Sequence, residues 1–336
     1  MKIIRAIILL FFGAIWVAGC SNELLSTLYK TGLIPDDYRY GDLYRLSNLA
    51  EFREPRPECP EFTAPKSTRK IALYIIGDSF TEKQRIDSSD FSVTRYHWAH
   101  WGENLHLKLD TAYTNIILLE SVERNVRPHF GTPVANVIPD TATFISHPAE
   151  VRFMHQLDRM FASEGVEDRL NTILFQFDPI LNFKELKSWI NQKFFDRTDP
   201  KVTLSGNGST MAYYEDTDST LLNSSYNHVP DAEIDSLVAV INFDKKFLEG
   251  LGFDQVWFSI IPNKATVLLP DYGIYNRIIE RIYRHPGLKV PSVGVLEDFK
   301  RIHQGAYLKG DSHWSCVGQR VWLEKVNRQV LGNSGI

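Results

Sequence analysis

Four short apolar runs recur along the chain, separated by stretches in which apolar residues repeat at helical spacing. The runs cover residues 71–76, 115–120, 172–177 and 256–261. A continuous apolar run of this length is typical of a strand buried on both faces, as in parallel sheets covered by helices. The helical spacing predicts helices over residues 98–109, 148–162, 183–195, 232–251 and 275–284. This alternation predicts an α/β protein with a layered, mostly parallel sheet.

The region from about residue 196 to residue 228 breaks that rhythm. Residues 202–204 and 211–214 favour strands, and Gly206-Asn207-Gly208 lies between them. Glycine and asparagine adopt the backbone angles of tight turns, so this region predicts an inserted β-hairpin.

The N-terminus has the pattern of an export signal. Lys2 and Arg5 precede an apolar run over residues 6–19, which as a helix spans about 21 Å, less than the roughly 30 Å of a bilayer core. The run ends in Val17-Ala18-Gly19-Cys20, which resembles the lipobox of bacterial lipoproteins. The resemblance implies cleavage before Cys20 and a lipid on its thiol. The alternative is an ordinary cleaved signal with a coincidental cysteine.

The expected organisation has three parts. Residues 1–19 are a signal peptide, and residues 20–68 are a lipid tether and an irregular N-terminal extension interrupted by prolines. Residues 69–336 are one catalytic domain with the inserted hairpin.

Composition narrows the classes of protein. The chain has 336 residues, 43% hydrophobic and 23% charged, which excludes a disordered or multi-span membrane protein. A formal net charge of -4 without a basic patch argues against nucleic-acid binding. Beyond Cys20 only Cys59 and Cys316 remain, and an exported pair of thiols either forms a disulfide or stays unrelated.

Metal and nucleotide motifs are missing. The chain has no HExxH, CxxC or GxSxG motif, and its glycine spacings do not complete a dinucleotide fingerprint or a phosphate loop. His97, His100 and His106 drift around the predicted helix instead of sharing one face. No metal and no cofactor are therefore expected.

Gly-Asp-Ser occurs twice, and the two copies have different surroundings. Ser79 follows the first apolar run directly, at the strand end where open α/β sheets bind their ligands. The second copy belongs to Asp311-Ser312-His313-Trp314. A serine hydroxyl needs a base, and the base needs an orienting acid. We therefore expect Ser79 as nucleophile, His313 as base and Asp311 as the acid that orients His313.

These segments resemble the SGNH (GDSL) hydrolase superfamily, in which Gly77-Asp78-Ser79-Phe80 matches the first block and Asp311 with His313 the last. The Asp-x-His-Trp form, together with residues 120–124 and 262–264, is also similar to the alginate O-acetyltransferase-like (DHHW) group. In that group the Asp-x-His-Trp segment precedes the serine, whereas here it follows. The resemblance covers residues 70–325 and implies a flavodoxin-like three-layer α/β/α sandwich and ester chemistry on acylated carbohydrate.

The resemblance leaves the oxyanion hole incomplete, because no Gly-x-Asn-Asp segment is present. The Ser79 N–H is the expected first donor, and Gly102, Arg124 or Asn125 are candidates for the others. Arg124 has an ordinary ion pair with Glu120 as its alternative role.

Three further residues are candidate substrate contacts. Asn263 and Lys264 follow an apolar run and are expected to contact the substrate or to form a simple turn. Trp314 is expected either to stack on a sugar ring or to pack in the core.

The sequence thus favours an exported, lipid-anchored serine esterase that removes O-acyl groups, most simply acetyl, from a glycan of the bacterial envelope. The alternatives are an O-acetyltransferase of an exported polysaccharide and a non-catalytic glycan-binding lipoprotein with the same fold. The expected partners are an acylated glycan or other ester, the membrane through Cys20, and components of polysaccharide export. The expected location is periplasmic or surface-facing.

Overall fold

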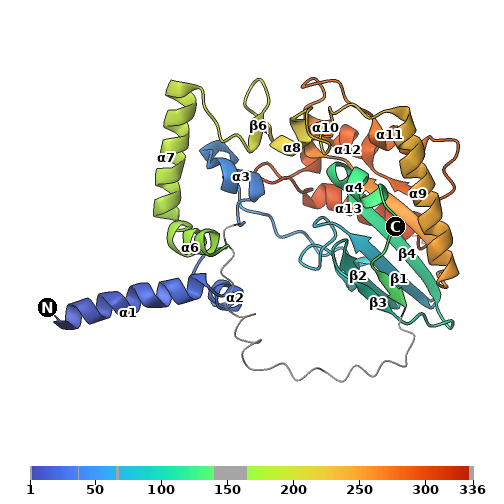
Figure 1. The fold of residues 1–336 in the computed structure, drawn as a ribbon, viewed down its shortest axis with the longest axis horizontal. Helices are drawn as coiled ribbons and strands as arrows, with labels where there is room; N and C mark the ends of the chain where they lie inside the picture. The colour runs from blue at the N-terminus through green and yellow to red at the C-terminus, as the bar shows by residue number, and fades with distance from the viewer. Residues whose placement is uncertain (1, 37, 66–67, 140–164, 333–336) are drawn as a thin grey trace. The chain divides into compact units, whose positions relative to one another are not determined.

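The computed structural model describes residues 2–36, 38–65, 68–139 and 165–332 (Figure 1). The contacts within the chain divide it into two compact units. Unit 1 contains Met1–Arg56 and Ala142–Asp199, and unit 2 contains Pro57–Thr141 and Pro200–Ile336. Residues 142–199, which the sequence placed within the catalytic domain, therefore group with the N-terminal residues.

Unit 2 is built on a five-stranded parallel sheet. Its strand order is β2-β1-β4-β8-β9. The strands are β1 (Ile71–Gly77), β2 (Arg95–His100), β4 (Thr114–Val122), β8 (Gln255–Ile261) and β9 (Ser292–Gly294). The three apolar runs predicted as strands in this unit are the three central ones, where each strand is hydrogen-bonded on both sides. Because the strands are parallel, the segments that follow them meet at one edge of the sheet.

Helices cover both faces of this sheet, as neighbouring residues of β8 demonstrate. The Phe258 ring packs against Phe130 of α4 (Val126–Phe130) and Tyr283 of α11 (Ile278–Tyr283). The next residue, Ser259, points to the other face and accepts a hydrogen bond from Trp322 of α13 (Cys316–Gln329). The predicted three-layer α/β/α architecture is confirmed. The remaining helices of these layers are α9 (Asp231–Gly250), α10 (Lys264–Leu268), α12 (Leu296–Ile302) and α13 (Cys316–Gln329).

The predicted hairpin is also confirmed. Strands β6 (Val202–Leu204) and β7 (Met211–Tyr213) pair antiparallel and lead into α8 (Tyr214–Thr217). The other short elements of unit 2 are β3 (Leu105–Leu107), β5 (Val137–Pro139), η2 (Ser88–Asp90), η3 (Glu123–Asn125) and η4 (His303–Ala306).

Two of the predicted elements have the wrong type. Residues 98–109 form the end of β2 and then β3, because β1 offers a free edge with which residues 95–100 pair. Residues 172–177 lie mostly in α6 (Val166–Phe175), whose acidic first turn, with Glu167 and Asp168, suits a helix N-terminus.

The remaining helix predictions differ only in extent or lie outside the described residues. Helices α7 (Asp178–Phe195) and α9 confirm the predictions over 183–195 and 232–251, and α11 is shorter than the predicted 275–284. The helix predicted over 148–162 falls among residues that the structure does not describe.

Unit 1 is helical in its described part. Besides α6 and α7 it contains α1 (Lys2–Gly19), α2 (Asn22–Lys30), α3 (Asp42–Ser47) and η1 (Ala50–Phe52), so the extension is less irregular than expected. Helix α1 is the one described helix that is long and apolar enough to cross a membrane, by length and composition, and a signal sequence passes the same test. Cys20 follows it directly and is not in a disulfide.

Candidate active site

Ser79 lies in a turn directly after β1. Gly77 ends that strand at a point where the chain passes very close to its neighbours: a Cβ there would lie 2.2 Å from Thr81 Oγ1 and 2.7 Å from Glu120 Oε2. Only glycine fits this position without displacing both side chains. The Ser79 N–H donates to no acceptor among the described residues, which leaves it available to a ligand.

The structure brings the three predicted catalytic residues together. Ser79 Oγ lies 2.8 Å from His313 Nε2, and His313 Nδ1 lies 2.6 Å from Asp311 Oδ1. An ionised Asp311 only accepts hydrogen bonds, so the proton of this contact lies on Nδ1, and Nε2 carries the lone pair that can accept the serine proton. Asp311 is buried, and it also accepts the backbone N–H of His313 at 3.0 Å. The geometry is that of a nucleophile, a base and an orienting acid.

Lys264 donates hydrogen bonds to the backbone of the loop that carries Asp311 and His313. The Lys264 ammonium is buried and donates to the backbone carbonyls of Leu308, Lys309 and Asp311 at 2.7, 2.9 and 2.9 Å. Three carbonyl acceptors replace the water that a buried ammonium group loses. Lys264 therefore stabilises the conformation of this loop.

The chain that follows the loop is also fixed. Ser315 Oγ accepts the backbone N–H groups of Val317 and Gly318 and so caps the N-terminus of α13. Cys316, the first residue of α13, forms a disulfide with Cys59, which answers the question that the sequence left open. The disulfide thus links the proline-rich segment around Cys59 to a position three residues after His313.

A second layer of polar contacts supports the Ser79 turn. Glu120 Oε2 accepts the Asp78 N–H at 2.8 Å and the Thr81 hydroxyl at 2.9 Å. Asp78 in turn accepts the Val122 N–H at 2.7 Å. Burial, and then the nearby Asp78 carboxylate, raise the pKa of Glu120 well above its ordinary value. The neutral form of Glu120 is therefore favoured beside Asp78.

The candidate oxyanion residues have different surroundings. Asn125 Nδ2 donates to Asp78 Oδ1 at 3.1 Å, which binds this side chain to the residue directly before Ser79. Arg124 is an ion-pair partner of buried Asp216, at 2.9 Å, and not of Glu120 as the alternative predicted. Gly102 lies exposed after β2, and its N–H donates to His100 Nδ1. Of the three, Asn125 is the one that a described hydrogen bond connects to the residue before Ser79.

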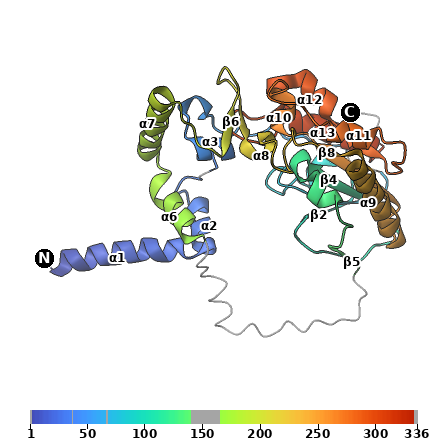
Figure 2. The same ribbon diagram turned by 45° about the horizontal axis from the view of Figure 1, so that its top comes forward.

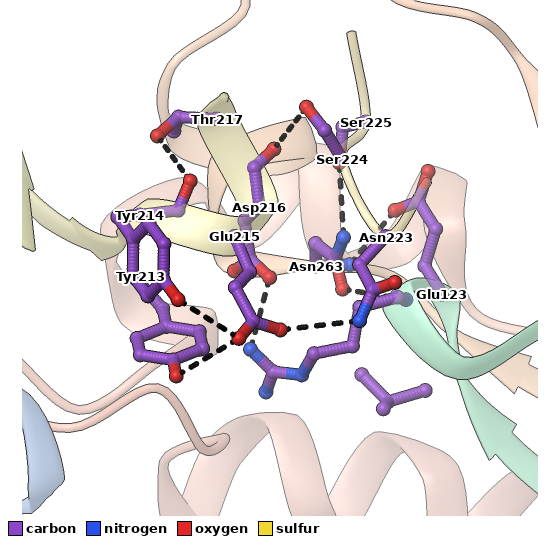
Figure 3. A network of polar contacts seen from close by, with 12 residues as sticks. Glu123, Tyr213, Tyr214, Glu215, Asp216, Thr217, Asn223, Ser224, Ser225 and Asn263 are labelled. Carbon is purple, nitrogen blue, oxygen red and sulfur yellow. Dashed lines mark hydrogen bonds and ion pairs between the residues drawn. The ribbon is translucent and has the colours of Figure 1, made fainter. Parts of the chain in front are cut away.

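Asn263 joins the ends of two central strands (Figure 3). Its N–H donates to Glu123 Oε2 at 2.8 Å, and its Oδ1 accepts the Arg124 N–H at 3.0 Å. Its Nδ2 donates to Ser225 Oγ. Glu123 is fully buried, and the loss of solvation raises its pKa to about 7. These contacts connect the segments after β4 and β8.

The inserted region adds a further part of this network. Glu215 accepts hydrogen bonds from the hydroxyls of Tyr213 and Tyr214 and from Asn223, while the neighbouring Asp216 pairs with Arg124 (Figure 3). The insertion therefore supports the strand end that carries Asn125.

The expected substrate contacts of three residues require correction. Asn263 and Lys264 are buried, and their polar atoms form hydrogen bonds within the protein. These bonds replace the water that each side chain loses on burial, so neither side chain is directed towards a substrate. Trp314 is also buried, with its ring against Phe80 and Trp322, so core packing and not sugar stacking is its role.

The sequence does not predict the supporting roles of Glu123 and Asp216. Glu123 lies within residues 120–124, which resemble the DHHW group, but nothing in the sequence marks either carboxylate as buried. Asp216 lies in the insertion, 92 positions from its partner Arg124. Only the folded chain reveals that pairing.

Comparison of the chain with protein-family models, with curated proteins and with solved structures finds no match.

Proposed function

We propose that this protein is an exported serine esterase of the SGNH type that removes O-acyl groups, most simply acetyl, from an envelope glycan. The observation that carries the proposal is the hydrogen-bonded series Ser79–His313–Asp311 at the carboxyl edge of the parallel sheet. The resemblance of the two Gly-Asp-Ser segments to that superfamily supports the same chemistry.

In the proposed reaction Ser79 Oγ attacks the acyl carbonyl while His313 Nε2 takes its proton. The negative oxygen that forms is stabilised by the Ser79 N–H and by Asn125 Nδ2. His313 then gives the proton to the departing sugar oxygen, and Asp311 stabilises the imidazolium between the two transfers. A water activated by His313 releases the acid, or a sugar hydroxyl accepts the acyl group if the protein is a transferase.

The first experiment measures p-nitrophenyl acetate turnover and fluorophosphonate labelling of the full chain. Ser79→Ala is expected to lower turnover by about 10³-fold or more and to abolish labelling. The matched control is Ser209→Ala, an exposed serine of the hairpin, which is expected to retain both. If the wild type shows neither turnover nor labelling of Ser79, the esterase proposal fails and the glycan-binding alternative is favoured.

The choice between hydrolysis and transfer is tested with the active protein. An acetyl donor is supplied with and without an oligosaccharide acceptor, and free acetate is compared with acetylated sugar. Free acetate as the main product in both cases supports the esterase, and acetylated sugar as the main product supports the transferase.

We further propose that the chain is held at the membrane by a lipid on Cys20. Its place directly after the apolar helix α1 supports this assignment. Cys20→Ala is expected to remove metabolic labelling by a fatty-acid analogue, and unchanged labelling would refute the lipid.

A further inference from the structure

Helix α7 of unit 1 has one face that packs against the N-terminal segment. Leu181 is buried on this face, and Ser188 Oγ donates to the Ser47 carbonyl at 2.9 Å. Glu185 accepts the Tyr44 hydroxyl at 2.7 Å and pairs with Arg53. These three α7 residues are four and three positions apart, so they form one stripe along the helix. The stripe fixes the orientation of α7 within its unit.

The opposite face of α7 is apolar and exposed. Its residues recur at the spacing of one helical face and are Phe183, Leu186, Ile190 and Phe194, with exposed fractions of 70, 51, 38 and 70%. Trp189, whose ring contacts that of Phe194, is 48% exposed. Exposed aromatic and aliphatic side chains in this number make a patch of roughly several hundred Å², the size that marks an interaction surface.

The patch continues towards the membrane attachment of the chain. Leu174, Phe175 and Phe177 are exposed where α6 leads into α7. Helix α6 contacts the end of α1: the Arg169 guanidinium donates to the Gly19 carbonyl at 2.6 Å, and Leu170 packs directly on Gly19. From Leu170 to Phe175 the helix rises only about 8 Å. Cys20 and the apolar α1 therefore belong to the same compact unit as the patch, with α6 between them (Figures 1 and 2).

Two forms of the N-terminus bring a bilayer to this place. A retained α1 inserts its apolar length into the membrane, and a chain cleaved and lipidated as proposed above carries its lipid on Cys20, directly after α1. The lysines of α7 are Lys184, Lys187 and Lys193. Cations beside an apolar aromatic face are typical of helices that lie in the interface of anionic membranes.

We propose that α7 lies on the bilayer surface with its Phe183–Phe194 face in the boundary between headgroups and acyl chains, and that the ligand of this face is anionic phospholipid. The proposal rests on the attachment of the N-terminus to a membrane and is independent of the ester chemistry. A second, interfacial attachment of this kind restricts the rotation of unit 1 about its anchor.

The experiment places the full chain in vesicles of phosphatidylcholine and phosphatidylglycerol that contain a photoactivatable phospholipid. Lipid adducts are mapped by mass spectrometry after illumination. The expected result is adducts on the exposed face of α7, at least about tenfold more abundant than on Phe243. Phe243 is the matched control, because it is a 52% exposed phenylalanine on a helix of unit 2.

A double variant, Phe183→Ser with Phe194→Ser, separates the α7 contact from the anchor. Both side chains are exposed, so an unchanged circular dichroism spectrum and melting temperature are expected. The variant is expected to lose the α7 adducts and to keep adducts at residues 2–20.

Two results overturn the proposal. One is adducts confined to residues 2–20 with none on α7. The other is an α7 face that is protected from a water-soluble labelling reagent in cells but gives no lipid adducts. That result assigns the face to a protein partner. Ester turnover measured on the same preparations reports separately on the proposed function, so failure of one does not imply failure of the other.

Discussion

Replacing Glu123 by glutamine is expected to make the stability of the protein less dependent on pH. Glu123 is fully buried, and burial raises its pKa from 4.5 to about 7. Between these values the folded protein holds a proton that the unfolded chain has lost, so the free energy of unfolding falls by about 1.4 kcal/mol per pH unit. Over the 2.5 units from 4.5 to 7 the contribution amounts to about 3 kcal/mol. This stability is present below pH 4.5 and is lost as the pH rises through about 7.

Glutamine keeps an oxygen that accepts the Asn263 N–H and the Thr266 hydroxyl, which both donate to Glu123 in the wild type. Glu123→Gln is therefore expected to match the wild type at pH 4.5 within about 1 kcal/mol and to be more stable by about 3 kcal/mol at pH 8. Urea unfolding followed by tryptophan fluorescence at several pH values measures this difference.

The matched control is Glu297→Gln, at a side chain that is 70% exposed. The stability of this variant relative to the wild type is expected to stay constant over the same range. If the difference between Glu123→Gln and the wild type is equally constant, Glu123 is ionised in the folded protein across this range. The reasoning from burial is then refuted.

Three further changes test the support of the site. Lys264→Met is expected to lower kcat for p-nitrophenyl acetate by about 100-fold with little change in KM, because the loop that carries Asp311 and His313 loses its ammonium donor. Lys264→Arg keeps a cationic donor and is expected to restore part of the rate. Gly77→Ala is expected to lower the free energy of unfolding by about 1–3 kcal/mol, whereas Gly206→Ala, which has nothing within 4 Å of an added Cβ, should leave it unchanged in thermal melting. Cys59→Ser is expected to lower the free energy of unfolding by about 2–5 kcal/mol, and adding Cys316→Ser should cause no further loss if the two thiols act only as a pair.

The central strands were predictable because their environment is uniform. β1, β4 and β8 are paired on both edges and covered on both faces, so nearly every position is buried and the middle of each strand is mostly apolar. β2 lies at the edge of the sheet, and its residues are mostly exposed or half-buried. Its mixture of aromatic, histidine and arginine side chains follows neither simple pattern, which is why the spacing of its apolar residues wrongly predicts a helix. An apolar run as short as 172–177 fits a strand and a buried helix face equally well.

The chemistry of the candidate site was easier to predict than its support. A serine at a strand end and an Asp-x-His segment are local features, and a common sheet edge brings them together. The direction in which a polar side chain points after a strand is not a local feature. Asn263 and Lys264 follow β8 as expected, but they point inward because the loop of Asp311 and the segment after β4 offer them acceptors and donors.

The inward direction of these groups limits how a substrate can be recognised. Lys264 and Asn263 have their polar atoms in contacts within the protein, and Trp314 is covered, so none of them distinguishes one acyl ester from another. The Ser79 N–H and the second N–H of Asn125 Nδ2, whose first N–H binds the residue before Ser79, are donors that the described contacts leave for a ligand. Both suit the carbonyl oxygen of an ester and carry no information about the sugar. In the proposed esterase the triad side of the site therefore recognises the acyl group, and selectivity for a glycan must come from residues that the two motifs do not contain.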